Sequence, residues 1–287
     1  MMKFSIKLLF LFSFFFSVSL NAQEQITEAS NFDEDFYVDD IVPKRIITEN
    51  RLLSYMPIRE ADITWQKRIW RIIDTREKIN LVFRAEQAPF FEILKGLIEN
   101  GDITAFEDEK FKEPLTFEQV EGKLFKIDTI TTFDFDTYDE KLEIVKNTKS
   151  WRDINKYRIK EIWYFDKQTS MLRNKIIGIA PLFTEVDPNG GYSLEFPLFW
   201  IYYPEARVSL ARHQVLNDEN DAAPMTWADR IDNRYFSSII IKQSNVLDYR
   251  IEDLFDSQSS MYGIDKLLES EKIKAELFNF EHDLWEY

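Results

Sequence analysis

Residues suited to catalysis or metal binding are few in this 287-residue chain. It contains two histidines, His213 and His282, and no cysteine. A zinc site needs three or four converging ligands, and neither histidine has a second one at a ligand-like spacing. Glu281 and Asp283, on either side of His282, point to different faces of a helix. We therefore expect no metal site, no cofactor and no cysteine nucleophile.

Carboxylates are too abundant to identify an acid and base pair. The chain has 51 Asp plus Glu, so neighbours such as Glu60 and Asp62 are typical of a solvated surface. Asp134, Asp136 and Asp139 suggest a calcium loop, but this stretch lacks the tight-turn glycine and the terminal bidentate acid. The sequence also lacks a phosphate-binding glycine pattern, a nucleophile elbow and a dinucleotide fingerprint. These observations predict a protein that is not an enzyme.

The segment at residues 58–80 has the strongest periodic pattern in the chain. At 100° per residue its apolar side chains fall on one stripe with spacings of three and four, which predicts an amphipathic helix. That stripe contains Ile58, Ala61, Trp65, Ile69, Ile72 and Ile73. A second, narrower stripe holds Ile63 and Trp70, with Lys67, Arg68 and Arg71 between the two. The first stripe must fill a core, and the second needs another explanation.

Two interpretations of the second stripe stay open. Large rings and arginine dominate the energetics of protein interfaces, which favours a partner-binding site on this flank. The site would consist of Ile63, Lys67, Trp70 and Arg71. The alternative is a wide core stripe along which the basic residues extend their apolar stems.

Aromatic residues in two later segments are further candidates for partner binding. Trp200 and Tyr202 share one side of a predicted strand, and neighbouring rings share the other. One side is expected to be core, and a helix or another subunit would cover the other. Phe280 and Trp285 lie near the end of the chain, which we expect to be docked because rings gain little at a free terminus.

A C-terminal helix is predicted from about residue 264, with apolar residues on two opposite sides. Such a helix either bends near Ser270 or Asn279 or is covered on both sides. Covering on both sides would make it part of an assembly contact. One stripe contains Ile264, Leu267, Leu268, Ala275 and Phe278, and the other contains Ile273, Leu277, Phe280 and Leu284.

The fold class predicted by the remaining pattern is α+β, an antiparallel sheet with helices packed at one face and at the chain ends. Strands at 157–166, 174–183 and 193–203 should form a meander with a turn at 187–191. Pro197 indicates a bulge or an edge location in that meander. A short strand is expected at 124–130, and a buried strand at 237–242.

Two further helices carry local start and stop signals. One begins at Pro89 and ends at Asn100-Gly101, and it should pack against the helix predicted at 58–80. The other follows Pro224, where Thr226 and Asp229 resemble a capping box. These elements predict a single domain at 51–287, with two smaller subdomains meeting near residue 150 as the alternative.

The first 22 residues are typical of an export signal, with Lys3 and Lys7 before an apolar run at 8–20. We expect cleavage before Gln23. An uncleaved anchor is the rival interpretation, but the apolar run is shorter than the roughly 20 residues that a spanning helix needs. Because the chain has no cysteine, it cannot carry a lipid anchor of the lipoprotein type. Any link to a membrane is expected to be through partners.

Residues 23–50 are acidic and have little periodicity, which predicts a partly disordered arm. Several apolar residues in this arm indicate that it docks on its own domain or on a neighbour. The whole chain has a formal charge of -15, which disfavours nucleic-acid binding through a phosphate-neutralising surface.

Four aromatic-rich blocks resemble the GldN/PorN family of gliding-motility and type IX secretion proteins, in the family's order. They are IREADITWQKRIWRIIDTREKIN at Ile58–Asn80, EIWYFDKQTSMLRNKIIGIAPL at Glu161–Leu182, FWIYYPEAR at Phe199–Arg207 and LLESEKIKAELFNFEHDLWEY at Leu267–Tyr287. The resemblance implies a non-enzymatic, periplasmic subunit that forms a ring with copies of itself and associates with the outer membrane.

The partners implied by the resemblance are an outer-membrane lipoprotein of the GldK/PorK type and the periplasmic part of a GldM/PorM-type motor component. A second hypothesis comes from another class of protein. In it the chain is a periplasmic small-ligand-binding or hydrolytic module that uses the aromatic sheet as the floor of a pocket.

Overall fold

The computed structural model describes residues 52–133, 140–186, 193–217, 220, 225–256 and 259–283, all within one compact unit, Glu49–Tyr287. The predicted export signal and acidic arm lie outside the described residues. So do the carboxylate loop at 134–139, the turn at 187–191 and Trp285.

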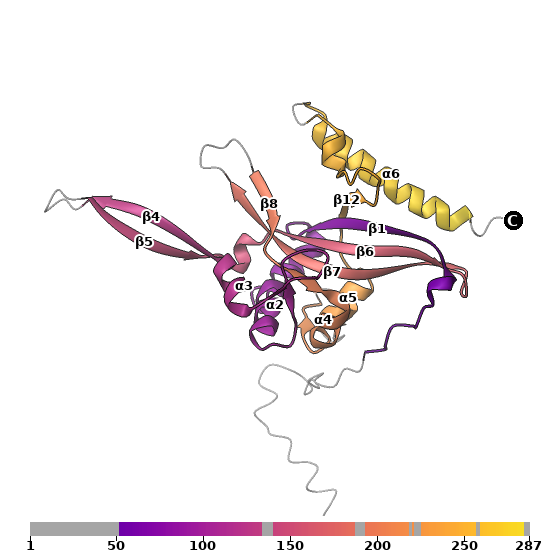
Figure 1. Cartoon of the computed structure of the whole chain (residues 1–287), viewed down its shortest axis with the longest axis horizontal. Coiled ribbons are helices and arrows are strands. Elements are labelled where there is room, and N and C mark those ends of the chain that lie inside the picture. Colours follow the sequence, from indigo (N-terminus) through magenta and orange to yellow (C-terminus); the bar gives the residue numbers. More distant parts are fainter. Residues whose placement is uncertain are drawn as a thin grey trace, which may run out of the picture. The chain divides into compact units, whose positions relative to one another are not determined.

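An eight-stranded antiparallel sheet dominates the described part of the chain, and helices cover it (Figure 1). Its order is β12-β1-β6-β7-β9-β2-β3, and β8 also pairs with β7. The α+β prediction is therefore confirmed. The strands are β1 (Ile63–Asp74), β2 (Ala105–Phe106), β3 (Pro114–Leu115), β6 (Lys156–Asp166), β7 (Met171–Val186), β8 (Ser193–Pro197), β9 (Trp200–Tyr202) and β12 (Ile239–Gln243).

The helix predicted at 58–80 is wrong, because most of this segment is strand β1. Short 3-10 turns flank it, η2 (Glu60–Asp62) before and η3 (Lys78–Arg84) after. Trp65, Ile69 and Ile73 are four residues apart, and a spacing of four puts side chains on one face in a strand as well as in a helix. The β-branched residues then favour the strand, and pairing with β6 along nearly its whole length stabilises it.

The predicted meander is confirmed by β6, β7 and β8, which pair antiparallel in that order. The third strand is divided, however. Pro197 ends β8 at the edge of the sheet, and the Leu198 amide donates to the Pro181 carbonyl at 3.0 Å. The chain then enters β9, which pairs with Gly178 and Ile179 of β7.

Helix α2 (Phe90–Glu99) begins after Pro89 and ends before Gly101, whose φ of 77° suits glycine, as predicted. Its predicted partner helix does not exist, and it packs instead against η3 and η4 (Trp151–Asp153). Helix α5 (Trp227–Asp232) has the predicted capping box, in which Thr226 and Asp229 exchange hydrogen bonds. The other helices on this side of the chain are α3 (Phe117–Leu124) and α4 (Tyr203–Leu210).

Two small sheets complete the described strands. β4 (Phe125–Phe133) and β5 (Glu140–Thr148) pair only with each other, and β4 confirms the strand predicted at 124–130. β10 (Gln214–Val215) pairs with β11 (Met225–Thr226). The main sheet takes strands from both sides of residue 150.

The largest hydrophobic cluster lies between one face of the sheet and α2, α4 and α5. Ile73 and Tyr157 contribute from the sheet, and Phe90 packs on Trp227 with ring centroids 4.4 Å apart. A smaller cluster on the opposite face joins Trp70, Ala180 and Trp200 with Phe111. Aromatic packing on both faces explains much of the chain's high aromatic content.

Helix α6 (Tyr262–Asp283) packs on β12 and on the 3-10 turn η5 (Ile251–Leu254). Its inner side buries Ser270, Ile273 and Leu277, and the Ser270 hydroxyl accepts a hydrogen bond from the Ile240 amide at 3.0 Å. The strand predicted at 237–242 is confirmed as β12, but its predicted burial is wrong, because β12 lies at the edge of the sheet and only Ile240 is fully buried.

Candidate functional site

Trp70 and Arg71 are neighbours in β1, so their side chains point to opposite faces of the sheet. Both are about 6% exposed. The Trp70 indole Nε1 donates to Glu109 Oε2 at 2.8 Å, and its ring packs in the cluster with Trp200. The two residues therefore do not form the joint surface patch that a helix would have made.

Arg71 belongs to a buried ion cluster centred on Glu161. The Glu161 carboxylate is fully buried, and it accepts hydrogen bonds from Arg71 Nε, from Arg234 Nη1 at 2.5 Å and from Trp163 Nε1 at 3.0 Å. Burial alone would raise the pKa of Glu161, but the guanidinium groups of Arg71 and Arg234 outweigh it and hold that pKa below its usual value. All polar positions of the carboxylate are used internally, so this cluster has a structural role.

A cavity of about 700 Å³ lies on the other face, where β1, β6, β8 and β12 meet η5 and the start of α6. We call it the Arg158 cavity, after the residue at its base. Arg158 is 7% exposed, and its Nε is fully buried without a hydrogen-bond partner. Arg158 and Arg250 also line an adjoining cavity of about 250 Å³, which Trp70 borders.

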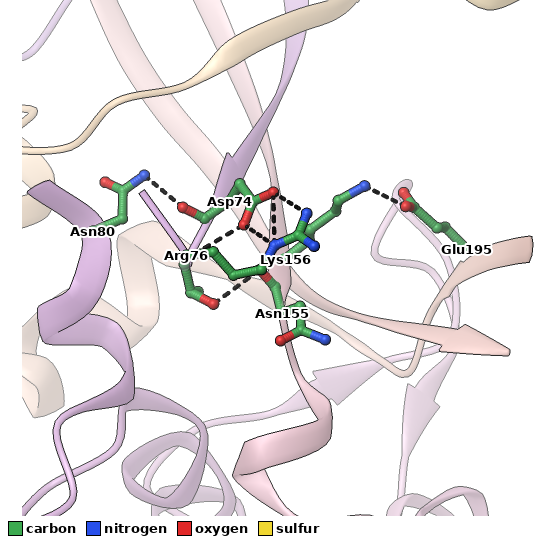
Figure 2. Close-up of polar contacts among 7 residues, drawn as sticks. Asp74, Arg76, Asn80, Asn155, Lys156 and Glu195 are labelled. Carbon is green, nitrogen blue, oxygen red and sulfur yellow. Dashed lines mark hydrogen bonds and ion pairs between the residues drawn. The ribbon is translucent and has the colours of Figure 1, made fainter. Parts of the chain in front are cut away.

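The carboxylates of the Arg158 cavity are already paired with other cations. Figure 2 shows Lys156 of β6 bound to Glu195 of β8, and Arg76 folded back on Asp74 with Nη2 to Oδ2 at 2.5 Å. The hydrogen bonds from Arg76 hold the pKa of Asp74 below its usual value. The third carboxylate, Glu252, pairs with Arg250 at 3.0 Å.

Backbone contacts fix the end of β1 beside this cavity. The Asn80 side-chain amide donates to the Asp74 carbonyl at 2.8 Å (Figure 2). It also donates to the Ser237 carbonyl at 2.9 Å. The Thr75 amide and hydroxyl both donate to the Asn155 carbonyl at 2.9 Å. Asn80 and Thr75 are fully buried, so they hold the strand end rigidly.

Arg158 is buried at a free-energy cost that the charges of Glu109, Glu252 and Glu195 offset only in part. It makes no hydrogen bond or ion pair with any residue in the described part of the chain. Burial lowers the pKa of its guanidinium, and the positive charge of Arg250 lowers it further. Sequence reasoning missed this residue, although its place between Tyr157 and Ile159 in a predicted strand puts it on the face opposite to theirs.

The outer side of α6 forms a row of exposed apolar residues, which we call the α6 outer row. Its members are Ile264, Leu267, Leu268 and Phe278, each between about half and two thirds exposed. The inner side is docked, and Phe280 stacks on Trp65 with ring centroids 4.7 Å apart. The sequence predicted apolar residues on both sides of this helix, and the described part of the chain covers one of those sides.

The other residues predicted to bind partners are dispersed. Ile63 and Lys67 are half-buried in β1, and Lys67 Nζ lies 3.4 Å from Gln243 Oε1. Trp200 is buried, whereas Tyr202 is 36% exposed beside the Phe111 ring. Phe280 is half-buried against Trp65. A partner role stays a prediction for the exposed members of this set.

The aromatic sheet face proposed as a pocket floor is largely filled. Phe111 packs edge-on against Trp200 at 6.3 Å and against Phe106 at 5.6 Å. This approach depends on Gly178, since a Cβ there would lie 2.5 Å from the Phe111 ring. The rings therefore bury one another and leave little aromatic surface for a ligand.

The described residues contain no metal-binding group and no membrane-spanning helix. Within the described ranges, no three His, Cys, Asp or Glu residues are placed to hold a metal ion. His213 lines a cavity of about 370 Å³ with Glu92 and Asp102, and burial lowers its pKa. None of the helices among the described residues combines the length and the apolar character needed to span a membrane.

Comparison with known proteins supplies the last observation. The model of a family described as "Gliding motility associated protein GldN" matches residues 58–286. A search of curated proteins gives no match. The family match covers the whole sheet, the Arg158 cavity and all of α6. The chain therefore belongs to the GldN family of gliding-motility-associated proteins.

Proposed function

We propose that this chain is a non-enzymatic structural subunit of a periplasmic ring in the machinery of gliding motility and type IX protein secretion. Membership of the GldN family makes it a component of that machinery. The ring, its association with the outer membrane and the absence of catalysis are the proposed parts. The observation that supports an assembly contact is the α6 outer row.

The α6 outer row has the properties of an interface element. The inner side of the helix is fixed to β12 and Trp65, so the outer side is presented on a rigid support. Fully burying a Leu or Phe side chain contributes about 1.5–3 kcal/mol. Contiguous exposed apolar residues on a helix mark contact sites for another protein. The row would therefore gain several kcal/mol on association.

Ring formation needs two different surfaces on each subunit, because a head-to-tail contact joins unlike patches. The α6 outer row would be one, and the exposed side of β9 at Tyr202 lies on a different part of the sheet. The partners proposed are further copies of the chain, an outer-membrane lipoprotein of the GldK/PorK type and the periplasmic part of a GldM/PorM-type motor component. A chain without cysteine depends on such a lipoprotein for lipid anchoring.

The test is assembly of the mature chain with its lipoprotein partner, measured by light scattering after size exclusion. Changing Leu268→Asp and Phe278→Asp together should raise the concentration needed for assembly at least tenfold, because about 1.4 kcal/mol corresponds to a factor of ten. Val208→Asp on α4, an equally exposed apolar position, is the matched control.

Folding of each variant is checked by its thermal transition. A folded Leu268→Asp, Phe278→Asp protein that assembles like the wild type would contradict the role of α6. Turnover of a small substrate that depends on His213 or His282 would contradict the non-enzymatic role.

A further inference from the structure

Arg158 stands out because it is buried without a carboxylate bound to it directly among the described residues, and Glu109, Glu252 and Glu195 act on it only at longer range. A buried charged group that lacks a partner is strongly unfavourable, and proteins normally pair it. Arg158 is 7% exposed and has no hydrogen bond or ion pair among the described residues. Its guanidinium borders two adjoining cavities. An arginine in this position can bind an anion that enters either cavity.

The Arg158 cavity has one more positive group than negative groups. Its cations are Lys156, Arg158, Arg250 and Lys266, and its carboxylates are Asp74, Glu195 and Glu252. The carboxylates each pair with a cation other than Arg158. A surplus of one positive charge in a chain of net charge -15 is a local feature that matches a singly charged anion.

The rim of the cavity is apolar and open to solvent. Leu194, Ile239 and Leu267 line it, and they are 68%, 37% and 49% exposed. A free phosphate would leave these side chains wet, and its second charge would face the neighbouring carboxylates. A carboxylate next to an apolar side chain would pair with Arg158 and also cover the apolar rim.

We propose that the Arg158 cavity binds a carboxylate carried on an acidic, partly apolar peptide segment of a protein partner. Arginine binds carboxylates through two parallel hydrogen bonds, which gives the contact a defined geometry. A volume of about 700 Å³ admits a few side chains. Leu267 belongs both to the rim of this cavity and to the α6 outer row. The assay measures peptide binding rather than assembly, and its variants lie at Arg158, Arg250 and Lys266, so the two proposals fail separately.

A peptide with the sequence of residues 31–42, NFDEDFYVDDIV, provides the probe, since it contains five acids and several apolar residues. It is labelled with a fluorophore and titrated against the mature chain by anisotropy. The matched peptide has every Asp and Glu replaced by Asn and Gln. The expected result is binding of the acidic peptide at least about tenfold tighter than that of the amide peptide, weakening with added salt.

Arg158→Gln tests the base of the cavity directly. It should weaken peptide binding at least about tenfold, whereas Arg152→Gln, at an exposed arginine on η4, should leave it unchanged. Because Arg158 has no partner to lose, its variant is expected to fold. If Arg158→Gln does not fold, Arg250→Gln and Lys266→Gln, at more exposed positions of the same cavity, provide a second test.

The titration is repeated on a chain whose own acids at 33–40 are changed to amides, so that this stretch cannot compete with the peptide. Equal binding to wild type and to the Arg158→Gln, Arg250→Gln and Lys266→Gln variants would overturn the proposal. So would an amide peptide that binds as well as the acidic one, no binding in either chain, or inorganic phosphate binding where the peptide does not.

Discussion

Replacing Glu161 by Gln tests whether the buried ion cluster holds β1, β6 and the Arg234 turn together. The substitution keeps the shape of the side chain and removes its charge. It leaves Arg71, with 8% of its side chain exposed, and Arg234, with 24% exposed, without a counter-charge. Removing one partner of a buried ion pair costs about 3–5 kcal/mol.

The expected loss of unfolding free energy is therefore at least about 3 kcal/mol, because two cations lose one carboxylate. In a chain of this size that corresponds to a fall of roughly 6–12 °C in Tm. Urea unfolding of the mature chain, followed by tryptophan fluorescence, measures it directly. The denaturant slope should stay unchanged, which separates lost stability from altered compactness.

Glu86→Gln is the matched control, because it removes a carboxylate from the ion pair with Arg152, in which the side chains of Arg152 and Glu86 are 67% and 81% exposed. Its expected cost is below about 1 kcal/mol. Changing Arg71, Glu161 and Arg234 together to Met should restore most of the stability lost in Glu161→Gln. A Glu161→Gln protein within about 1 kcal/mol of the wild type would refute the view that these charges depend on one another.

The remaining predictions concern acid, close packing and capping. The pKa of Glu161 is depressed in the fold, so its contribution to stability is complete above the unfolded pKa of about 4.3 and is lost as pH falls below that value. The acid-induced loss of stability, measured by circular dichroism, should therefore be shallower in Glu161→Gln. Gly178→Ala should cost about 1–3 kcal/mol through contact with Phe111, whereas Gly96→Ala in α2, with open space around it, should gain about 0.5–1 kcal/mol in urea unfolding. Thr226→Ala should cost about 1 kcal/mol in the same assay, because it removes the cap of α5; a value near zero would contradict that role.

Local signals were sufficient for the elements that start and stop with special residues. Pro89 and Gly101 delimit α2, and Thr226 with Asp229 caps α5, as the sequence indicated. The β6–β8 meander was equally visible, because neighbouring strands pair through a short connection. In each case the decisive interaction lies within a few residues along the chain.

The identity of β1 could not be settled locally. Its apolar residues at intervals of four fit the period of a helix and also that of a strand, and its partners β6 and β12 come from distant parts of the sequence. The sheet selects the strand, since β6 pairs with β1 along nearly its whole length and β12 pairs with its residues 69–72, which satisfies the backbone. Without the helix, Trp70 and Arg71 face opposite clusters and do not share one surface.

The two buried arginines of the central strands show why the candidate site could not be seen in the sequence. On one face, Glu161 is a diagonal neighbour of Arg71 across the β1–β6 pair, and the charges meet. On the other face, Arg158 lies opposite Ile72, and its diagonal neighbour Asp74 is bound by Arg76.

Arg158 therefore differs from Arg71 in register rather than in residue type. Its neighbours along β6 on the same face are Lys156 and Lys160, so its own strand supplies only further positive charge. A shift of pairing by two residues would change which carboxylates are within reach, and no sequence pattern reports that shift. If the peptide assay shows that this arginine accepts an external carboxylate, the register of β1 against β6 is what creates the site.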